Sequence, residues 1–189
     1  MDLSGKVFVI DPGHGGKFPG AKYKGNVEEE ITLKFSKALR EVLRAENAES
    51  VKMTRINDRD FGGTKIEDDL NKRVKDINRR YADDSVDILI SIHVNTNNPF
   101  NRKGVFYPEN GKASKVLAQN IQRKYATFHP AAGAWAEDLA ILRDTKIAGA
   151  KVLIELGQID DFWYDDPDQV ERAATAIVAG IYDYFREIE

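Results

Sequence analysis

The sequence predicts a layered α/β domain, with helices on both faces of a central sheet. Short apolar runs typical of strands alternate with longer segments in which apolar residues recur at helical spacing. The 189 residues, 42% of them apolar, are enough for one domain with a substantial core. No linker rich in Pro, Gly or Ser divides the chain, so we expect a single domain over residues 1–189.

Five apolar runs have the length and composition of β-strands. Two of them, at 87–94 and 151–156, are apolar almost throughout, which indicates strands that are buried on both faces of the sheet. A weaker strand candidate lies at 139–142. The five runs are 6–10, 51–54, 87–94, 104–107 and 151–156.

Four segments repeat apolar residues every three or four positions, which is the spacing of one face of an amphipathic helix. In the first of them, Ile31, Phe35 and Leu39 follow this spacing. The longest stretches with neither pattern lie at 56–66 and 127–138, and we expect them to be irregular. The predicted helices are 31–43, 70–77, 116–125 and 170–185.

Composition excludes several classes of partner and site. With 28 basic and 31 acidic residues, the net charge of −3 provides no overall positive field, so we do not expect nucleic acid as a partner. The chain has no cysteine, which excludes disulfides and thiolate ligands. Any metal ion must therefore be held by His, Asp or Glu.

No window approaches the roughly 18 uncharged apolar residues of a membrane span, so we expect no membrane association. The first six residues also lack the basic and then apolar pattern of an export signal. We expect that a signal has been removed, or that the protein leaves the cell by another route.

Two of the three histidines lie where apolar runs end. His14 follows the run at 7–10, His93 ends the run at 88–92, and Glu155 follows a third run at 152–154. Chemistry in open α/β sheets collects outside the strand ends. Two imidazoles and a carboxylate placed in this way predict a metal site, and two His with one Glu is a recurrent set for catalytic zinc.

The residues alone leave the oxygen ligand open. Glu155 interrupts a run that otherwise looks buried, and a buried carboxylate needs a partner such as a cation, a metal or a water network. Residues 28–30 are three consecutive glutamates at the start of the first predicted helix. They complement the positive end of the helix, and one of them could also face the loop that carries His14.

Other interpretations of these segments are weaker. The glycines at 13, 15 and 16 form neither of the usual nucleotide-binding patterns, so we expect them to let the backbone turn tightly around a ligand residue. Ser91 would share a strand face with His93, but no nucleophile elbow surrounds it, and we expect a packed small residue. For His129 we expect a loop or surface role, with substrate-groove contact as the alternative.

Asp11 and an aromatic cluster each allow two interpretations. Asp11 either orients His14 or makes a hydrogen bond within the turn, and we weigh these equally. The aromatic residues at 162–164 are expected to pack in the core, with a role in lining a sugar or peptide groove as the alternative.

The chain resembles one known family in several motifs that occur in the same order. The segment Val-Ile-Asp-Pro-Gly-His-Gly-Gly at 9–16 and the Ser-Ile-His-Val-Asn motif at 91–95 resemble the histidine motifs of the zinc-dependent N-acetylmuramoyl-L-alanine amidases of the amidase 3 family, which cut cell-wall peptidoglycan. Weaker matches are the Glu-rich segment 27–33, the arginine-containing stretches 53–55 and 70–73, and the segments 140–143 and 152–157, which resemble the family's final strand pair.

This resemblance implies a mixed, roughly six-stranded sheet and a residue for each role. His14, Glu28 and His93 would bind Zn²⁺, which selects Glu28 from the three glutamates, and Glu155 would be the catalytic carboxylate. Asn95, in the second histidine motif, joins Asp11 as a candidate for contact with the substrate or with the ligand residues.

The implied activity is hydrolysis of the amide bond between N-acetylmuramic acid and L-alanine, by a zinc-activated water with Glu155 as general base and acid. Peptidoglycan is then the expected partner, the cell wall outside the membrane the expected place of action, and a monomer the expected state. The alternatives are a zinc peptidase or other small-amide hydrolase, and a non-enzymatic wall-binding domain. A phage or mother-cell lysin released by lysis would need no export signal.

The chain departs from the family pattern after the last strand. Gln158, Asp160 and Asp161 stand where the family usually has Phe and then Ser-Asn, and a proline common before the strand is replaced within 147–150. These changes leave the expected metal ligands intact. They affect one wall of the substrate groove, so we expect them to change substrate preference.

Overall fold

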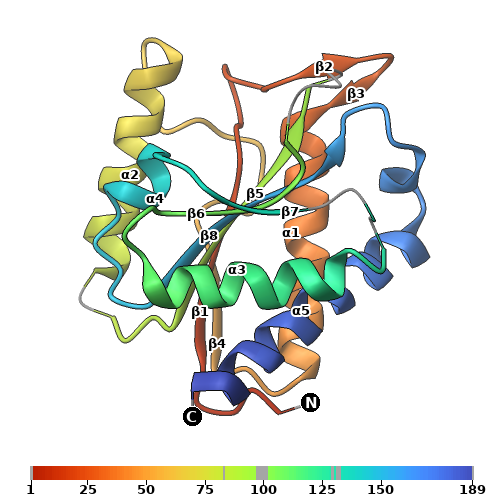
Figure 1. Cartoon of the computed structure of the whole chain (residues 1–189). Helices are drawn as coiled ribbons and strands as arrows, with labels where there is room; N and C mark the ends of the chain where they lie inside the picture. Colours follow the sequence, from red (N-terminus) through yellow and green to blue (C-terminus); the bar gives the residue numbers. More distant parts are fainter. Residues whose placement is uncertain (1, 83, 97–101, 129, 131–132, 189) are drawn as a thin grey trace.

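A six-stranded sheet forms the centre of the protein, as shown by a computed structural model that describes residues 2–82, 84–96, 102–128, 130 and 133–188 (Figure 1). The strand order is β4-β1-β5-β8-β6-β7. Strands β4, β1, β5 and β8 are parallel, β6 runs antiparallel to β8, and β7 is parallel to β6. The strands are β1 Val7–Pro12, β4 Ser50–Met53, β5 Ile88–Asn95, β6 Gly104–Tyr107, β7 Gly133–Ala136 and β8 Ala150–Gln158.

The predicted α/β class and the mixed six-stranded sheet are therefore confirmed, and helices cover both faces. The larger core cluster lies between the sheet and helices α1, α3 and α5, whereas α2 and α4 pack on the opposite face. The helices are α1 Glu28–Ala45, α2 Ile66–Tyr81, α3 Lys112–Tyr125, α4 Ala140–Arg143 and α5 Pro167–Ile188, with a 3₁₀ turn η1 at Phe162–Asp165.

Alternation along the strands decides which side chains face α2. In β5, Ile90 and Ile92 belong to the core on the α1 side and Leu89 to the core on the α2 side. Because successive side chains of a strand point to opposite faces, His93 is on the same face as Leu89. In β8, Glu155 shares the face of Leu153 in the same way.

The chain order creates a switch point beside β1. From β1 the chain moves outward to β4, and then returns to form β5 on the other side of β1. In open α/β sheets, ligands bind at the carboxyl ends of the strands where the order reverses in this way. In Figure 1 this end lies at the top, near the short hairpin β2 (Lys22–Tyr23) and β3 (Asn26–Val27), and the two termini lie at the opposite end.

Two local predictions were wrong. The strand candidate at 139–142, which the family resemblance also placed in a final strand pair, is the helical turn α4. A run of four apolar residues is compatible with either state, and Ile141 and Leu142 are buried against α2 without strand pairing. The stretch 127–138, predicted to be irregular, contains the edge strand β7, whose Gly-Ala-Trp-Ala sequence lacks the β-branched residues that mark strands.

No helix within the described part of the chain is long and apolar enough to cross a membrane.

Candidate metal centre

The two site histidines come from neighbouring strands at the switch point. His93 is in β5, and His14 lies in the loop that leaves β1, with a φ of 61° in the left-handed region. Since β1 and β5 pair in parallel up to Pro12 and Ile92, both residues emerge at the same edge of the sheet. Their rings stand 5.0 Å apart in an edge-to-face arrangement.

Glu28 comes from a third segment, the first residue of α1. The β2–β3 hairpin leads directly into this helix, and the Glu28 amide donates to the carbonyl of Ala21. The carboxylate accepts hydrogen bonds from the backbone amides of Ala21 (2.9 Å) and Val94 (3.1 Å). These two bonds fix the carboxylate at the end of β5, next to His93.

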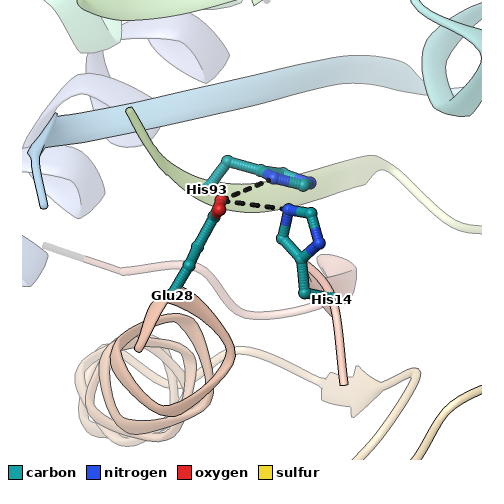
Figure 2. A group of neighbouring side chains, drawn as sticks. All are labelled: His14, Glu28 and His93. Atoms are coloured by element: carbon teal, nitrogen blue, oxygen red, sulfur yellow. Dashed lines mark hydrogen bonds and ion pairs between the residues drawn. The ribbon is translucent and has the colours of Figure 1, made fainter. Parts of the chain in front are cut away.

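The three side chains converge on one point (Figure 2). Glu28 Oε1 lies 3.2 Å from His14 Nε2 and 3.1 Å from His93 Nδ1, and the three potential ligand atoms are all within 4.8 Å of one another. Burial opposes ionisation of Glu28, which is only 5% exposed, but the hydrogen bonds and charges of the two histidines outweigh this and lower its pKa. Glu28 is therefore an anion between two imidazoles.

This arrangement fits a divalent metal ion. Two imidazole nitrogens and a carboxylate oxygen around one point form a donor set typical of catalytic zinc, which uses three protein ligands and leaves one position open. Each donor comes from a different segment, so the arrangement depends on the tertiary fold. The neighbouring glutamates at 29 and 30 are not part of the cluster.

Two glycines leave the space in which the ligand side chains meet. A Cβ on Gly13 would lie 2.5 Å from His93 Cε1, and a Cβ on Gly20 would lie 2.4 Å from Glu28 Oε2 and 2.7 Å from the His14 ring. Any side chain at these positions would displace one of the three potential ligand side chains. The tight turn expected around His14 is made by Gly15 and Gly16, which both have a positive φ.

Glu155 lies beside the cluster, directly across from His93 in the pairing of β5 and β8. Its Oε2 atom is buried and has no hydrogen-bond partner in the described structure. Burial, together with the negative charge of Glu28, raises the pKa of Glu155 to about 8. A carboxyl group with this pKa can both accept and release a proton near neutral pH.

A groove of about 440 Å³ joins these groups to solvent. His14, His93 and Glu155 lie at its base, and α2, α4 and the neighbouring strands form mainly apolar walls. The groove can therefore exclude water from much of a bound substrate while it leaves the two histidines and Glu155 accessible. The wall residues are Asp11, Phe18, Ile66, Asp69, Leu70, Arg73, Phe106, Glu137, Leu139, Ala140, Ile141 and Leu153.

Asp11 and Ser91 belong to a buried polar network beneath the groove. The Asp11 carboxylate accepts hydrogen bonds from Thr54 Oγ1 (2.6 Å), Ser91 Oγ (3.0 Å) and Arg73 (3.1 Å). Ser91 is fully buried and bound to Asp11, so it is the packed residue that the sequence favours. Among the described residues, Arg73 links the Asp11 carboxylate to His14, because it also donates to the His14 carbonyl.

Three further candidates from the sequence are Asn95, the aromatic residues at 162–164 and His129. The Asn95 side chain is buried and donates to the carbonyl of Arg102 (2.7 Å), so it is part of the support around the end of β5. Trp163 and Tyr164 pack against the core as expected, but Phe162 is 96% exposed. His129 lies outside the described residues.

Sequence reasoning assigned no role to Arg55 and Arg73. Both are buried, and both donate hydrogen bonds to the loop that carries His14. The only signal was their position in two stretches that resemble family motifs. Periodicity gave no indication, because a buried arginine on an amphipathic helix or after a strand looks like any other surface charge.

The comparisons with known proteins agree with this geometry. Residues 8–183 match the family model Amidase_3, described as N-acetylmuramoyl-L-alanine amidase. The probable cell wall amidase LytH of Staphylococcus aureus is 34% identical over 195 residues, which cover 97% of this chain and 60% of LytH. The chain thus spans less than two thirds of the length of that relative.

Solved structures of amidases have the same fold. The CwlD amidase from Clostridioides difficile, solved in complex with the GerS lipoprotein, has a TM-score of 0.81 at 26% identity, covering 96% of this chain and 98% of that one. The catalytic domain of CwlV from Bacillus (Paenibacillus) polymyxa var. colistinus has a TM-score of 0.74 at 26% identity, with the same coverage. On these grounds the chain belongs to the Amidase_3 family of N-acetylmuramoyl-L-alanine amidases.

Proposed function

We propose that this chain is a zinc-dependent amidase that hydrolyses the bond between N-acetylmuramic acid and L-alanine in peptidoglycan. The observation that carries the proposal is the convergence of His14, Glu28 and His93 beside Glu155, whose buried Oε2 atom has no hydrogen-bond partner among the described residues. Membership of the family supplies the bond and the substrate class.

Each residue then has a distinct role. His14, Glu28 and His93 would hold the ion, which would supply Lewis acidity and lower the pKa of a bound water. Glu155 Oε2 would accept the proton of the attacking water and pass it to the nitrogen of the departing alanine. Glu155 lies directly across from His93 in the pairing of β5 and β8, which places its carboxyl group beside the three potential ligands, and the apolar walls of the groove would keep other water away.

The biological setting follows from the substrate. Peptidoglycan lies outside the bacterial membrane, so the enzyme would act in the extracellular or periplasmic space, and we propose that it does so as a monomer whose catalytic domain is the whole of residues 1–189. Of the residues that depart from the family pattern, Gln158 ends β8 and Asp160 and Asp161 follow it, and none of the three is among the described residues that line the groove.

Mass spectrometry of digested muropeptides tests the proposal. The wild-type protein should release intact stem peptides that begin with L-alanine, and a chelator should abolish the release until Zn²⁺ is restored. Glu155→Gln should bind zinc and lose activity, whereas His93→Ala should lose both. Cleavage within the stem peptide would instead identify a peptidase, and zinc binding without any cleavage would identify a wall-binding domain.

A further inference from the structure

Two buried arginines bind three consecutive carbonyl groups of the His14 loop. Arg73 donates to the carbonyls of Pro12 (2.7 Å) and His14 (2.6 Å), and its guanidinium is anchored by Asp11 (3.1 Å). Arg55 donates to the carbonyls of Pro12 (3.1 Å) and Gly13 (2.8 Å). Arg55 is 2% exposed and Arg73 4%. The peptide backbone of the loop is thus held from below while its imidazole points to the cluster.

Arg55 also reaches the segment that carries Glu28. The same terminal nitrogen that binds Gly13 donates to the carbonyl of Glu29 (2.8 Å) and to Thr32 Oγ1 (3.1 Å), both in the first turns of α1. Thr32 Oγ1 in turn donates to the Gly13 carbonyl (2.8 Å). The loop after β1 and the start of α1 are therefore tied together at a fixed spacing.

The loop needs such support because of its conformation. His14 has a φ of 61°, a left-handed backbone that is unfavourable for a residue with a side chain, and glycines flank it on both sides. Left to itself, a loop of this kind would sample other conformations, in which the imidazole points elsewhere. We propose that Arg55 and Arg73 are positioning residues that hold the His14 loop at the distance from Glu28 that metal binding requires. This inference rests on the proposed metal centre.

A contribution to fold stability alone does not explain these two side chains. Both guanidiniums are buried, and within the described residues Asp11 is the one carboxylate that binds either of them. Burial and the charge of the nearby Arg73 lower the pKa of Arg55, so the two cations oppose each other. Buried charges with incomplete pairing cost stability, and apolar residues of similar size would serve a purely structural purpose better. The planar guanidinium holds five N–H donors in a fixed arrangement that can reach carbonyls on two segments, whereas the three donors of a lysine ammonium project from one nitrogen atom.

The test uses Arg73→Lys and Arg55→Lys, which keep the positive charge but lose the planar arrangement of N–H donors. Zinc affinity is measured by competition with a chromogenic chelator, and the visible spectrum of the Co²⁺-loaded protein reports the coordination geometry. Each variant should bind zinc about tenfold to a hundredfold more weakly, as losses around metal ligands do. The cobalt spectrum should also change. Neither readout depends on amidase activity.

Val74→Ala is the matched control, because Val74 follows Arg73 on α2, is buried in the core and has no hydrogen bond to the loop. It should lower stability to urea and leave zinc affinity and the cobalt spectrum unchanged. If the lysine variants bind zinc like the wild type, or if Val74→Ala weakens binding as much as they do, the inference is wrong.

Thr32→Val provides a second test if a lysine variant fails to fold. This change removes only the hydroxyl that links Gly13 to α1, so it should weaken zinc binding in a folded protein, and unchanged binding would overturn the proposed link. The proposed function fails separately: a wild-type protein that binds no zinc would overturn both proposals, whereas a zinc-binding wild type with unaffected variants would overturn only this one.

Discussion

Replacement of Glu155 by glutamine should make the metal-free protein more stable at neutral pH. The Glu155 side chain is half-buried, with its Oε2 atom removed from solvent, and its pKa rises from an ordinary value of 4.5 to about 8 on folding. Folding therefore favours the protonated form. The stability associated with this group is complete below the unfolded pKa and is lost progressively as the pH rises through the folded value. Glutamine cannot ionise, so the variant avoids this loss.

The size of the effect follows from the two pKa values. Each pKa unit corresponds to about 1.4 kcal/mol, so between about pH 5 and about pH 7 the wild type should lose roughly 2.5 kcal/mol relative to Glu155→Gln. Urea unfolding in the presence of a chelator, followed by tryptophan fluorescence, measures this difference at each pH. Contributions from other titrating groups cancel in the comparison as long as the substitution leaves them unchanged.

Glu137→Gln is the control, because Glu137 also lines the groove but its side chain is 46% exposed. The free energy of unfolding of Glu137→Gln should change between pH 5 and pH 7 as that of the wild type does. If Glu155→Gln and the wild type change in parallel from pH 5 to pH 7, the Glu155 carboxyl has no raised pKa. The account of it as a poised proton carrier would then be wrong.

Three further changes test the packing around the site. Gly13→Ala should weaken zinc binding by about tenfold or more, because its Cβ would lie 2.5 Å from the His93 ring; chelator competition that shows unchanged affinity would contradict this. Zinc at about a hundredfold excess over Kd should stabilise the wild type by roughly 2.7 kcal/mol in urea unfolding and should not stabilise His93→Ala. Leu117→Ala, in the core between α3 and the sheet, should cost about 2–5 kcal/mol but leave zinc affinity intact; a loss of affinity would show that the site depends on remote packing.

The sequence predicted the layers of the fold because most elements have an unambiguous period. β5 and β8 are apolar runs too short for helices, and α5 repeats its apolar residues over six turns. Prediction failed where the pattern was short or the strand lay at an edge. The four residues of α4 are too few to show a period, and β7 is held by pairing with β6, a contact between segments far apart in the sequence.

The site was predictable to the extent that its residues break a local pattern. His14 and His93 at strand ends and Glu155 in a buried strand were visible for that reason. Glu28 was not, because the two glutamates that follow it are equivalent on sequence grounds, and only the family resemblance selected it. Glu28 differs from the other two glutamates in its tertiary contacts. The β2–β3 hairpin and the Val94 amide fix its carboxylate beside His93.

The ionisable groups around the site share a physical property that links stability to function. Glu28, Glu155, Arg55 and Arg73 are all largely removed from water, and each would be cheaper to bury as an apolar residue of similar size. Glu28 lies within hydrogen-bond distance of two histidines and Arg73 is paired with Asp11, but Glu155 and Arg55 have no single matching counter-charge in the described structure. A divalent cation at the cluster would offset the negative charges of Glu28 and Glu155 together. The metal-free protein should therefore be the less stable form, and the unfavourable free energy of its buried charges should come from the same residues that would bind and use the ion.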